Sequence, residues 1–195
     1  MRKLVLAVGL VLMASGAQAV TLNVIGGILH GASNVLVDGS SYDVQFLDGT
    51  CIDLYSGCDE NTDFTIDSEA SALLASQALL DQVFLDVSEG SFDSLPGLVN
   101  GCAIGGTVAC EVVTPWACAA GTPCVGGAGG FRGAIAYNVT GVLTDELVNL
   151  LTPLNSAEDS SSLGVAYAVW SQVPEPSSGL LLGLGLVGMA ARRRV

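Results

Sequence analysis

Basic residues are scarce in this chain of 195 residues, which contains six Lys and Arg against 19 Asp and Glu. Five of the six lie within the first three or the last four positions. Residues 20–173 therefore hold Arg132 as their one base, together with 18 acids, for a formal net charge of −17. A surface of this sign gains nothing from counterion release on phosphate, so we exclude nucleic acid as a partner.

The chain also lacks the residues on which most hydrolytic and zinc sites depend. His30 is its only histidine, and no Gly-x-Ser-x-Gly sequence is present to expose a nucleophilic serine. A serine or cysteine nucleophile needs a neighbouring base. No Cys-x-x-Cys pair occurs, which argues against zinc. We therefore expect no catalytic residues and no resident cofactor.

Long apolar runs are missing as well, because neither end reaches the roughly 20 residues that a stable membrane span needs. At the start, Arg2 and Lys3 precede an apolar stretch that ends at Ala17-Gln18-Ala19. Signal peptidase accepts such a small-x-small pattern. We predict that residues 1–19 are a signal peptide, with Ala17 and Ala19 as the small residues of the cleavage site. The mature chain is expected to begin at Val20 and to be exported.

Six cysteines are present, an even number that in an exported chain favours disulfide bonds over free thiols. A turn at Ser56-Gly57 could bring Cys51 and Cys58 together, so we predict this pair. The other four are expected to pair among themselves in a connectivity that the sequence leaves open. The six positions are Cys51, Cys58, Cys102, Cys110, Cys118 and Cys124.

Hydrophobic periodicity predicts strands before a helix. Tyr42, Val44 and Phe46 alternate with more polar residues after an Asp38-Gly39 turn, which is typical of a β-hairpin. A further short strand is expected at Cys51. From position 68 to 88 no Gly or Pro interrupts the chain, and Asp67 or Ser68 could cap a helix there. Its apolar side is predicted to comprise Ala70, Leu73, Leu74, Leu80 and Phe84.

Residues 89–130 are rich in Gly, Pro and Cys, so we expect loops with one short strand near Val112. Two more strands are predicted at 131–142 and 163–172, with a short helix capped by Thr144 between them. The fold class that follows is α+β. A small antiparallel meander would pack with one main helix in a single disulfide-stabilised extracytoplasmic domain, residues 20–172.

The end of the chain, residues 173–195, combines three features in a fixed order. Pro174-Glu175-Pro176 comes first, a short apolar run of 13 residues follows at 179–191, and Arg192, Arg193 and Arg194 close it. The arginines favour a cytoplasmic C-terminus, with the rest of the protein outside. The run is short for a permanent anchor, which is typical of a segment held in the membrane only until it is cut.

This ending resembles the PEP-CTERM sorting signal. The resemblance implies an exosortase as a partner, transient insertion of the tail into the inner membrane as a short transmembrane helix, and removal of that tail. It also implies a Gram-negative bacterium that makes exopolysaccharide, with the body at the cell surface or in a biofilm matrix. In the body, "YDVQFLDGTCIDLYSGC" and "ALLASQALLDQVFLD" resemble a recurrent group of proteins that share this signal and have no assigned activity.

Acidic residues gather in the loop-rich stretch at 48–67, where hard oxygen ligands could bind calcium. Their spacing does not fit the EF-hand pattern. The candidate ligands are Asp48, Asp53, Asp59, Glu60 and Asp63. Three functions therefore remain open: a non-catalytic structural or adhesive protein, which we favour, a calcium-dependent binding module, and a carbohydrate-active enzyme with paired carboxylates. Extracellular polysaccharide is the expected partner.

Overall fold

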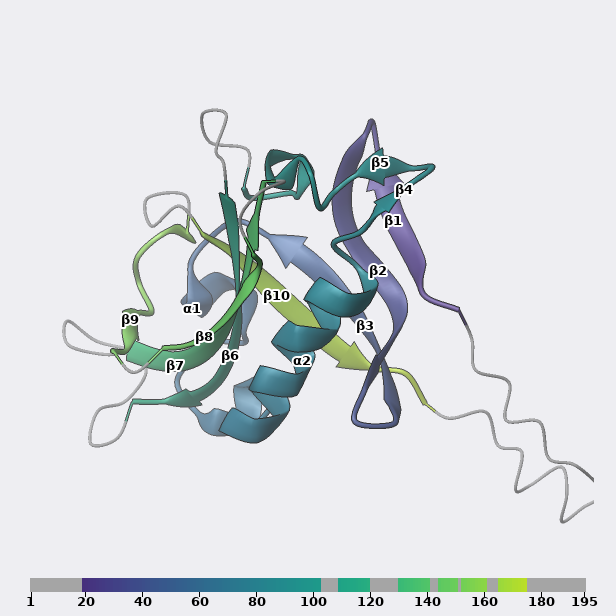
Figure 1. The fold of residues 1–195 in the computed structure, drawn as a ribbon. Coiled ribbons are helices and arrows are strands. Elements are labelled where there is room, and N and C mark those ends of the chain that lie inside the picture. Colours follow the sequence, from purple (N-terminus) through teal and green to yellow (C-terminus); the bar gives the residue numbers. More distant parts are fainter. Residues whose placement is uncertain are drawn as a thin grey trace, which may run out of the picture.

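The computed structural model describes residues 19–102, 109–119, 130–140, 144–150, 152–160 and 165–174. The main feature of this part is one sheet of eight strands in the order β1-β2-β3-β10-β6-β7-β8, with β9 paired to β7 (Figure 1). The strands of this sheet are β1 (Thr21–Ile25), β2 (Ile28–Val37), β3 (Ser40–Leu47), β6 (Ala109–Cys118), β7 (Gly130–Val139), β8 (Glu146–Asn149), β9 (Leu154–Asn155) and β10 (Val165–Gln172).

The remaining elements are short, apart from one helix. They are α1 (Cys51–Leu54), the 3₁₀ turn η1 (Asn61–Asp63), α2 (Glu69–Gln82), the small hairpin of β4 (Asp86–Val87) and β5 (Gly90–Ser91), and the 3₁₀ turn η2 (Pro96–Leu98). The predicted fold class, a small antiparallel meander with one main helix, is wrong. The sheet is large and mixed and dominates the molecule, because β10 pairs in parallel with β6 and joins two antiparallel halves.

The β2–β3 hairpin is confirmed at the predicted turn. Val37 pairs with Ser40, and Asp38 and Gly39 between them have φ values of 47° and 82°. A two-residue turn of this kind needs positive φ at both positions, which Asp-Gly supplies at low cost. Val44 and Phe46 are buried as their alternation predicts. Cys51, expected in the next strand, instead begins α1, whose N-cap is Thr50.

Helix α2 is confirmed, with Ser68 as its N-cap, but its predicted apolar side is only partly right. Leu80 and Phe84 are buried as predicted, whereas Ala70 is exposed. Leu74 is 47% exposed, whereas Ala72, Ala75 and Leu79 are fully buried. These three recur at helical spacing and face the sheet, where small side chains permit close approach of the helix. The helix lies across one face of the sheet (Figure 1), over residues of β2, β6 and β7.

The opposite face of the sheet carries a second core. Tyr55 is the C-terminal cap residue of α1. Its ring packs against that of Tyr167 on β10, with centroids 5.9 Å apart, and against that of Phe64, with centroids 5.4 Å apart. The Tyr55 hydroxyl donates a hydrogen bond to the carbonyl of Ala168 at 2.9 Å. This core fixes the disulfide loop that follows β3 to the central strand of the sheet.

Two sequence expectations in the second half of the chain are wrong. The Gly- and Cys-rich region contains β6, a ten-residue strand next to the centre of the sheet rather than a short one near Val112. Pro115 lies in this strand where the register with β7 shifts, a position that tolerates a missing N–H. The predicted helix after Thr144 is the edge strand β8, paired with β7.

Both ends of the folded body leave it on the same side. Thr21, at the start of β1, pairs with Ser33 of β2, and Gln172, at the end of β10, pairs with Tyr42 of β3. In Figure 1 the two chain ends accordingly depart together, beside the β2–β3 turn. Residues 1–18, the predicted signal peptide apart from Ala19, lie outside the described residues.

Gly31 on β2 tests the tight pairing between β2 and β3. Its φ is 153°, and a Cβ there would collide with the carbonyl oxygen of Val44 on β3. We expect Gly31→Ala to lower the free energy of unfolding by about 3 kcal/mol, since backbone must move. Gly26→Ala is the control: its φ is 61° but its Cβ would meet nothing, so about 1 kcal/mol is expected. Equal losses of unfolding free energy in the two variants, measured by urea unfolding, would contradict the close approach of β2 and β3 as the cause.

Candidate functional site

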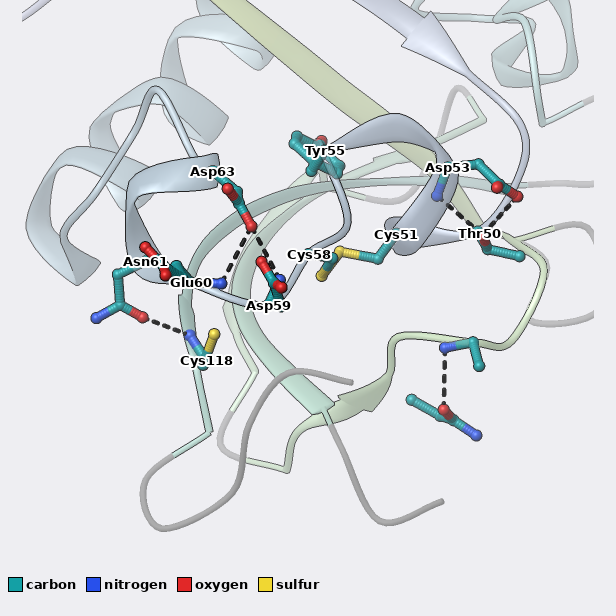
Figure 2. The surroundings of a disulfide bond; sticks show 12 residues. Thr50, Cys51, Asp53, Tyr55, Cys58, Asp59, Glu60, Asn61, Asp63 and Cys118 are labelled. Atoms are coloured by element: carbon teal, nitrogen blue, oxygen red, sulfur yellow. Dashed lines mark hydrogen bonds between the residues drawn. A yellow bond between two sulfur atoms is a disulfide. The ribbon is translucent and has the colours of Figure 1, made fainter. Parts of the chain in front are cut away.

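The disulfide loop between β3 and α2 is the first candidate site, because most of the predicted calcium ligands lie in it. Cys51 and Cys58 form the predicted disulfide, with their Cα atoms 5.7 Å apart. Figure 2 shows Asp53 on one side of this bond and Asp63 on the other. A second disulfide joins Cys102 and Cys110.

The other two cysteines are described incompletely. Cys118 is disulfide-bonded, and Cys124 lies outside the described residues. The backbone N–H of Cys118 donates to the Asn61 side-chain oxygen at 2.8 Å, which ties the end of β6 to the acidic loop (Figure 2). Among the described cysteines none is free.

The loop carboxylates accept hydrogen bonds from their own turns. Asp63 accepts the backbone N–H groups of Asp59 and Glu60 at 2.9 and 3.1 Å (Figure 2). These bonds, the one from Glu60 above all, lower the pKa of the Asp63 carboxyl. Asp53 accepts from the hydroxyl of Thr50 at 2.7 Å and lies in the first turn of α1.

The predicted calcium ligands do not converge. Asp48 accepts a hydrogen bond from the hydroxyl of Ser160, a residue near the end of the body. The carboxylates of the Asp59–Asp63 turn instead bond within their own segment. Among the residues that the structure describes, no group of three or more His, Cys, Asp or Glu side chains is placed to hold a metal ion. The set Asp48, Asp53, Asp59, Glu60 and Asp63 is thus not brought together as a ligand shell.

A pair of carboxylates elsewhere was missed by sequence reasoning. Asp86 of β4 accepts the backbone N–H groups of Asp93 and Ser94 and the hydroxyl of Ser94, and the Ser94 bonds lower its pKa. The pKa of Asp93 is raised by partial burial, and further by the charges of Asp145 and Asp86. The β4–β5 hairpin brings these acids together across seven positions, a spacing that has no recognisable sequence signal.

A surface hollow borders Val20, the predicted start of the mature chain, and contains one carboxylate. It is lined by Val20, Thr21, Leu22, Gln82, Leu85, Val87 and Glu89. A hydrogen bond from Ser88 lowers the pKa of Glu89. A glycosidase acid needs a raised pKa and a second carboxylate nearby, so this hollow does not provide the paired site.

Arg132, the one base of the body, lies on β7 and is half-buried. Its Nε atom is buried without a hydrogen-bond partner. Within the described ranges no carboxylate forms an ion pair with it.

The predicted sorting motif begins where the sheet ends. Gln172 is the last residue of β10, and the Val173 N–H still donates to the carbonyl of Ser41 at 2.9 Å. Pro174 follows, is exposed, and has no N–H with which to extend the pairing. Glu175, Pro176 and the arginines 192, 193 and 194 lie outside the described residues. In the part that is described, no helix is long and apolar enough to cross a membrane.

The Asp63 turn yields a pH-dependent prediction. Its folded pKa is lowered, so the carboxylate stabilises the fold above its unfolded pKa, and this contribution is lost as pH falls through the folded value. We expect Asp63→Asn to lower the free energy of unfolding by roughly 0.5–1 kcal/mol at pH 7, a usual cost for losing a capping interaction. In urea unfolding the difference from wild type should vanish near pH 2. A loss of equal size at both pH values would contradict it.

Comparison with known proteins concerns the end of the chain. The family model of the PEP-CTERM protein-sorting motif matches residues 172–194, starting at the last residue of β10. No match to a curated protein or to a solved structure was found. The chain therefore carries a PEP-CTERM sorting motif, which implies export and exosortase-dependent sorting to the cell surface.

Proposed function

We propose that the body is a non-catalytic structural or adhesive component of the cell surface or extracellular matrix of a Gram-negative bacterium. The observation that carries this proposal is the sorting motif joined directly to a folded, disulfide-braced body. A protein removed from the membrane by its sorting enzyme acts outside the cell, where disulfides persist and neither chaperones nor reductants repair it. Signal peptidase and extracellular polysaccharide complete the proposed set of partners.

The charge of the body supports an adhesive role among neutral or cationic partners. With one base and 18 acids in residues 20–173, the surface stays soluble and repels anionic polymers. Neutral polysaccharide contacts the exposed polar groups without such repulsion. Calcium, if it takes part, would act between molecules on this acidic surface rather than in a preformed cage.

A second candidate function, a carbohydrate-active enzyme, is supported by one observation. The pKa values of Asp86 and Asp93 move apart, as those of a catalytic base and acid do. Asp86 is exposed, Asp93 is partly exposed, and neither acid lines the hollow beside Val20 and Glu89, so this candidate is the weaker one.

Sorting can be tested on the native protein. We expect unreduced protein from the envelope and the medium to lack the tail beyond the Pro-Glu-Pro region and to contain no free thiol, as measured by intact-mass spectrometry. Replacing Arg192, Arg193 and Arg194 by Gln should leave the full-length chain in the membrane, because orientation of the tail depends on its positive end. Arg132→Gln is the control and should be processed normally. Wild type ending at Val195 and confined to the inner membrane would contradict sorting.

The role of the body can be tested on the processed protein. We expect it to sediment with exopolysaccharide from the producing cells without releasing new reducing ends. Release of reducing ends that is abolished in Asp93→Asn would instead establish the enzyme. Equilibrium dialysis with calcium distinguishes the binding module, since binding well below millimolar concentration would require a site that the described residues do not form.

A further inference from the structure

We propose that the end of the β2–β3 hairpin is the surface of the body that contacts the exosortase during removal of the tail. This surface consists of Leu36 and residues 38–41, and is called the exit face below. The proposal rests on exosortase-dependent sorting and adds to it a contact between the enzyme and the folded body.

The sorting motif overlaps the fold. Its first matched residue, Gln172, is paired with Tyr42, and the second, Val173, donates its N–H to Ser41 at 2.9 Å. The tail therefore leaves the body directly beside the β2–β3 turn, as Figure 1 shows. No linker separates the recognised segment from the sheet.

The reach of the chain sets how near the enzyme must come. Residues 174–176 can span at most about 10 Å when fully extended. An enzyme that acts at the Pro-Glu-Pro motif must therefore approach Ser41 to about that distance. At this separation, a membrane enzyme cannot avoid the surface of the hairpin end.

The exit face offers an apolar contact at this point. Leu36 is 52% exposed, and it lies opposite Ser41, which adjoins Val173 on the next strand. Residues directly opposite one another on neighbouring strands point to the same face of a sheet. Leu36, Ser41 and Val173 thus form a row across the strands that leads to Pro174. This row lies on the face of the sheet away from α2. Its neighbours on β2, Val35 and Val37, point to the other face, where they belong to the core beneath that helix.

The exit face is held rigidly, as a docking surface requires. The side chain of Gln82, at the end of α2, both accepts from the Leu36 N–H at 3.0 Å and donates to the Leu36 carbonyl at 2.9 Å. Asp43 accepts the Asn34 N–H at 3.0 Å next to the bulge in β2. The hairpin therefore has little conformational entropy to lose on contact.

The negative charge of the body favours the enzyme, and not the lipid surface, as the partner of the exit face. Asp38 is exposed at the turn, and residues 20–173 carry a net charge of −17. Anionic headgroups repel such a body, so the hairpin end does not gain from lying on the bilayer. A protein surface can contact Leu36 without this cost.

The test compares two leucines of equal exposure in the full-length chain, expressed in exosortase-containing cells. Leu36→Asn should slow tail removal about fivefold, as loss of one apolar interface contact does. Leu95→Asn is the control, at a position that is 53% exposed and precedes η2, and it should be processed at the wild-type rate. The segment after η2 is bridged through Val99 to Leu29, at the opposite end of β2 from Leu36. Pulse-chase labelling followed by mass spectrometry measures the rate, and urea unfolding of the processed forms checks their stability.

A second variant leaves the folded body unchanged. Six Gly and Ser residues inserted between Val173 and Pro174 add up to about 20 Å of reach, which lowers the effective concentration of the exit face at the enzyme. We expect this insertion to slow processing as Leu36→Asn does, and Leu36→Asn to have no further effect within it. Faster processing after insertion would overturn the proposal, since the body would then be an obstacle.

The remaining outcomes separate the contact from sorting itself. An uncleaved wild-type chain would mean that sorting fails, whereas wild-type rates in Leu36→Asn would overturn only the contact. Binding of the processed protein to vesicles of phosphatidylglycerol and phosphatidylethanolamine, lost in Leu36→Asn while its tail removal stays at the wild-type rate, would assign the exit face to lipid and overturn the proposal.

Discussion

The pairing of β10 is the constraint on which the rest of the structure depends. This strand lies between β3 and β6, antiparallel to one and parallel to the other, so it alone joins the β1–β3 half of the sheet to the β6–β8 half. Both cores are built on it: Ala166, Ala168 and Trp170 face α2, and Val165 and Tyr167 face α1. Its run of apolar residues is typical of a strand buried on both faces. Without β10 each half would expose an unpaired edge and half of each core.

This arrangement connects folding to sorting through chain order. β10 is the last element of the body, and the sorting motif begins at its final residue. The two halves therefore cannot close until the segment immediately before the tail has emerged. Non-local pairing of this kind is slow, because the chain must lose the entropy of closing a long loop before the paired strands can make stabilising contacts.

Sequence reasoning identified the local features and missed those that depend on distant partners. The Asp38-Gly39 turn, the Ser68 cap and the Cys51–Cys58 pair are specified by a few neighbouring residues, and the structure has all three. β6 was predicted too short because Pro115 and the surrounding glycines and cysteines indicate loops, and the bulge that accommodates Pro115 exists only opposite β7. The buried side of α2 was misjudged because hydrophobicity favours Leu74, whereas the sheet surface admits Ala72 and Ala75. The Asp86–Asp93 pair needs the hairpin to form before its acids meet.

The acids of the body illustrate how a fold with almost no bases satisfies its carboxylates. Ion pairs cannot serve, because Arg132 is the one base within residues 20–173. Asp43, Asp63, Asp86 and Asp145 instead accept backbone N–H groups. Such bonds stabilise individual turns over short distances, where salt screens little, unlike surface ion pairs, which weaken as ionic strength rises. Several turns are thus capped by acids without any base, and two short connections are closed by disulfides. Neither device needs a positive charge, which is how a body with one base and 18 acids stabilises its loops.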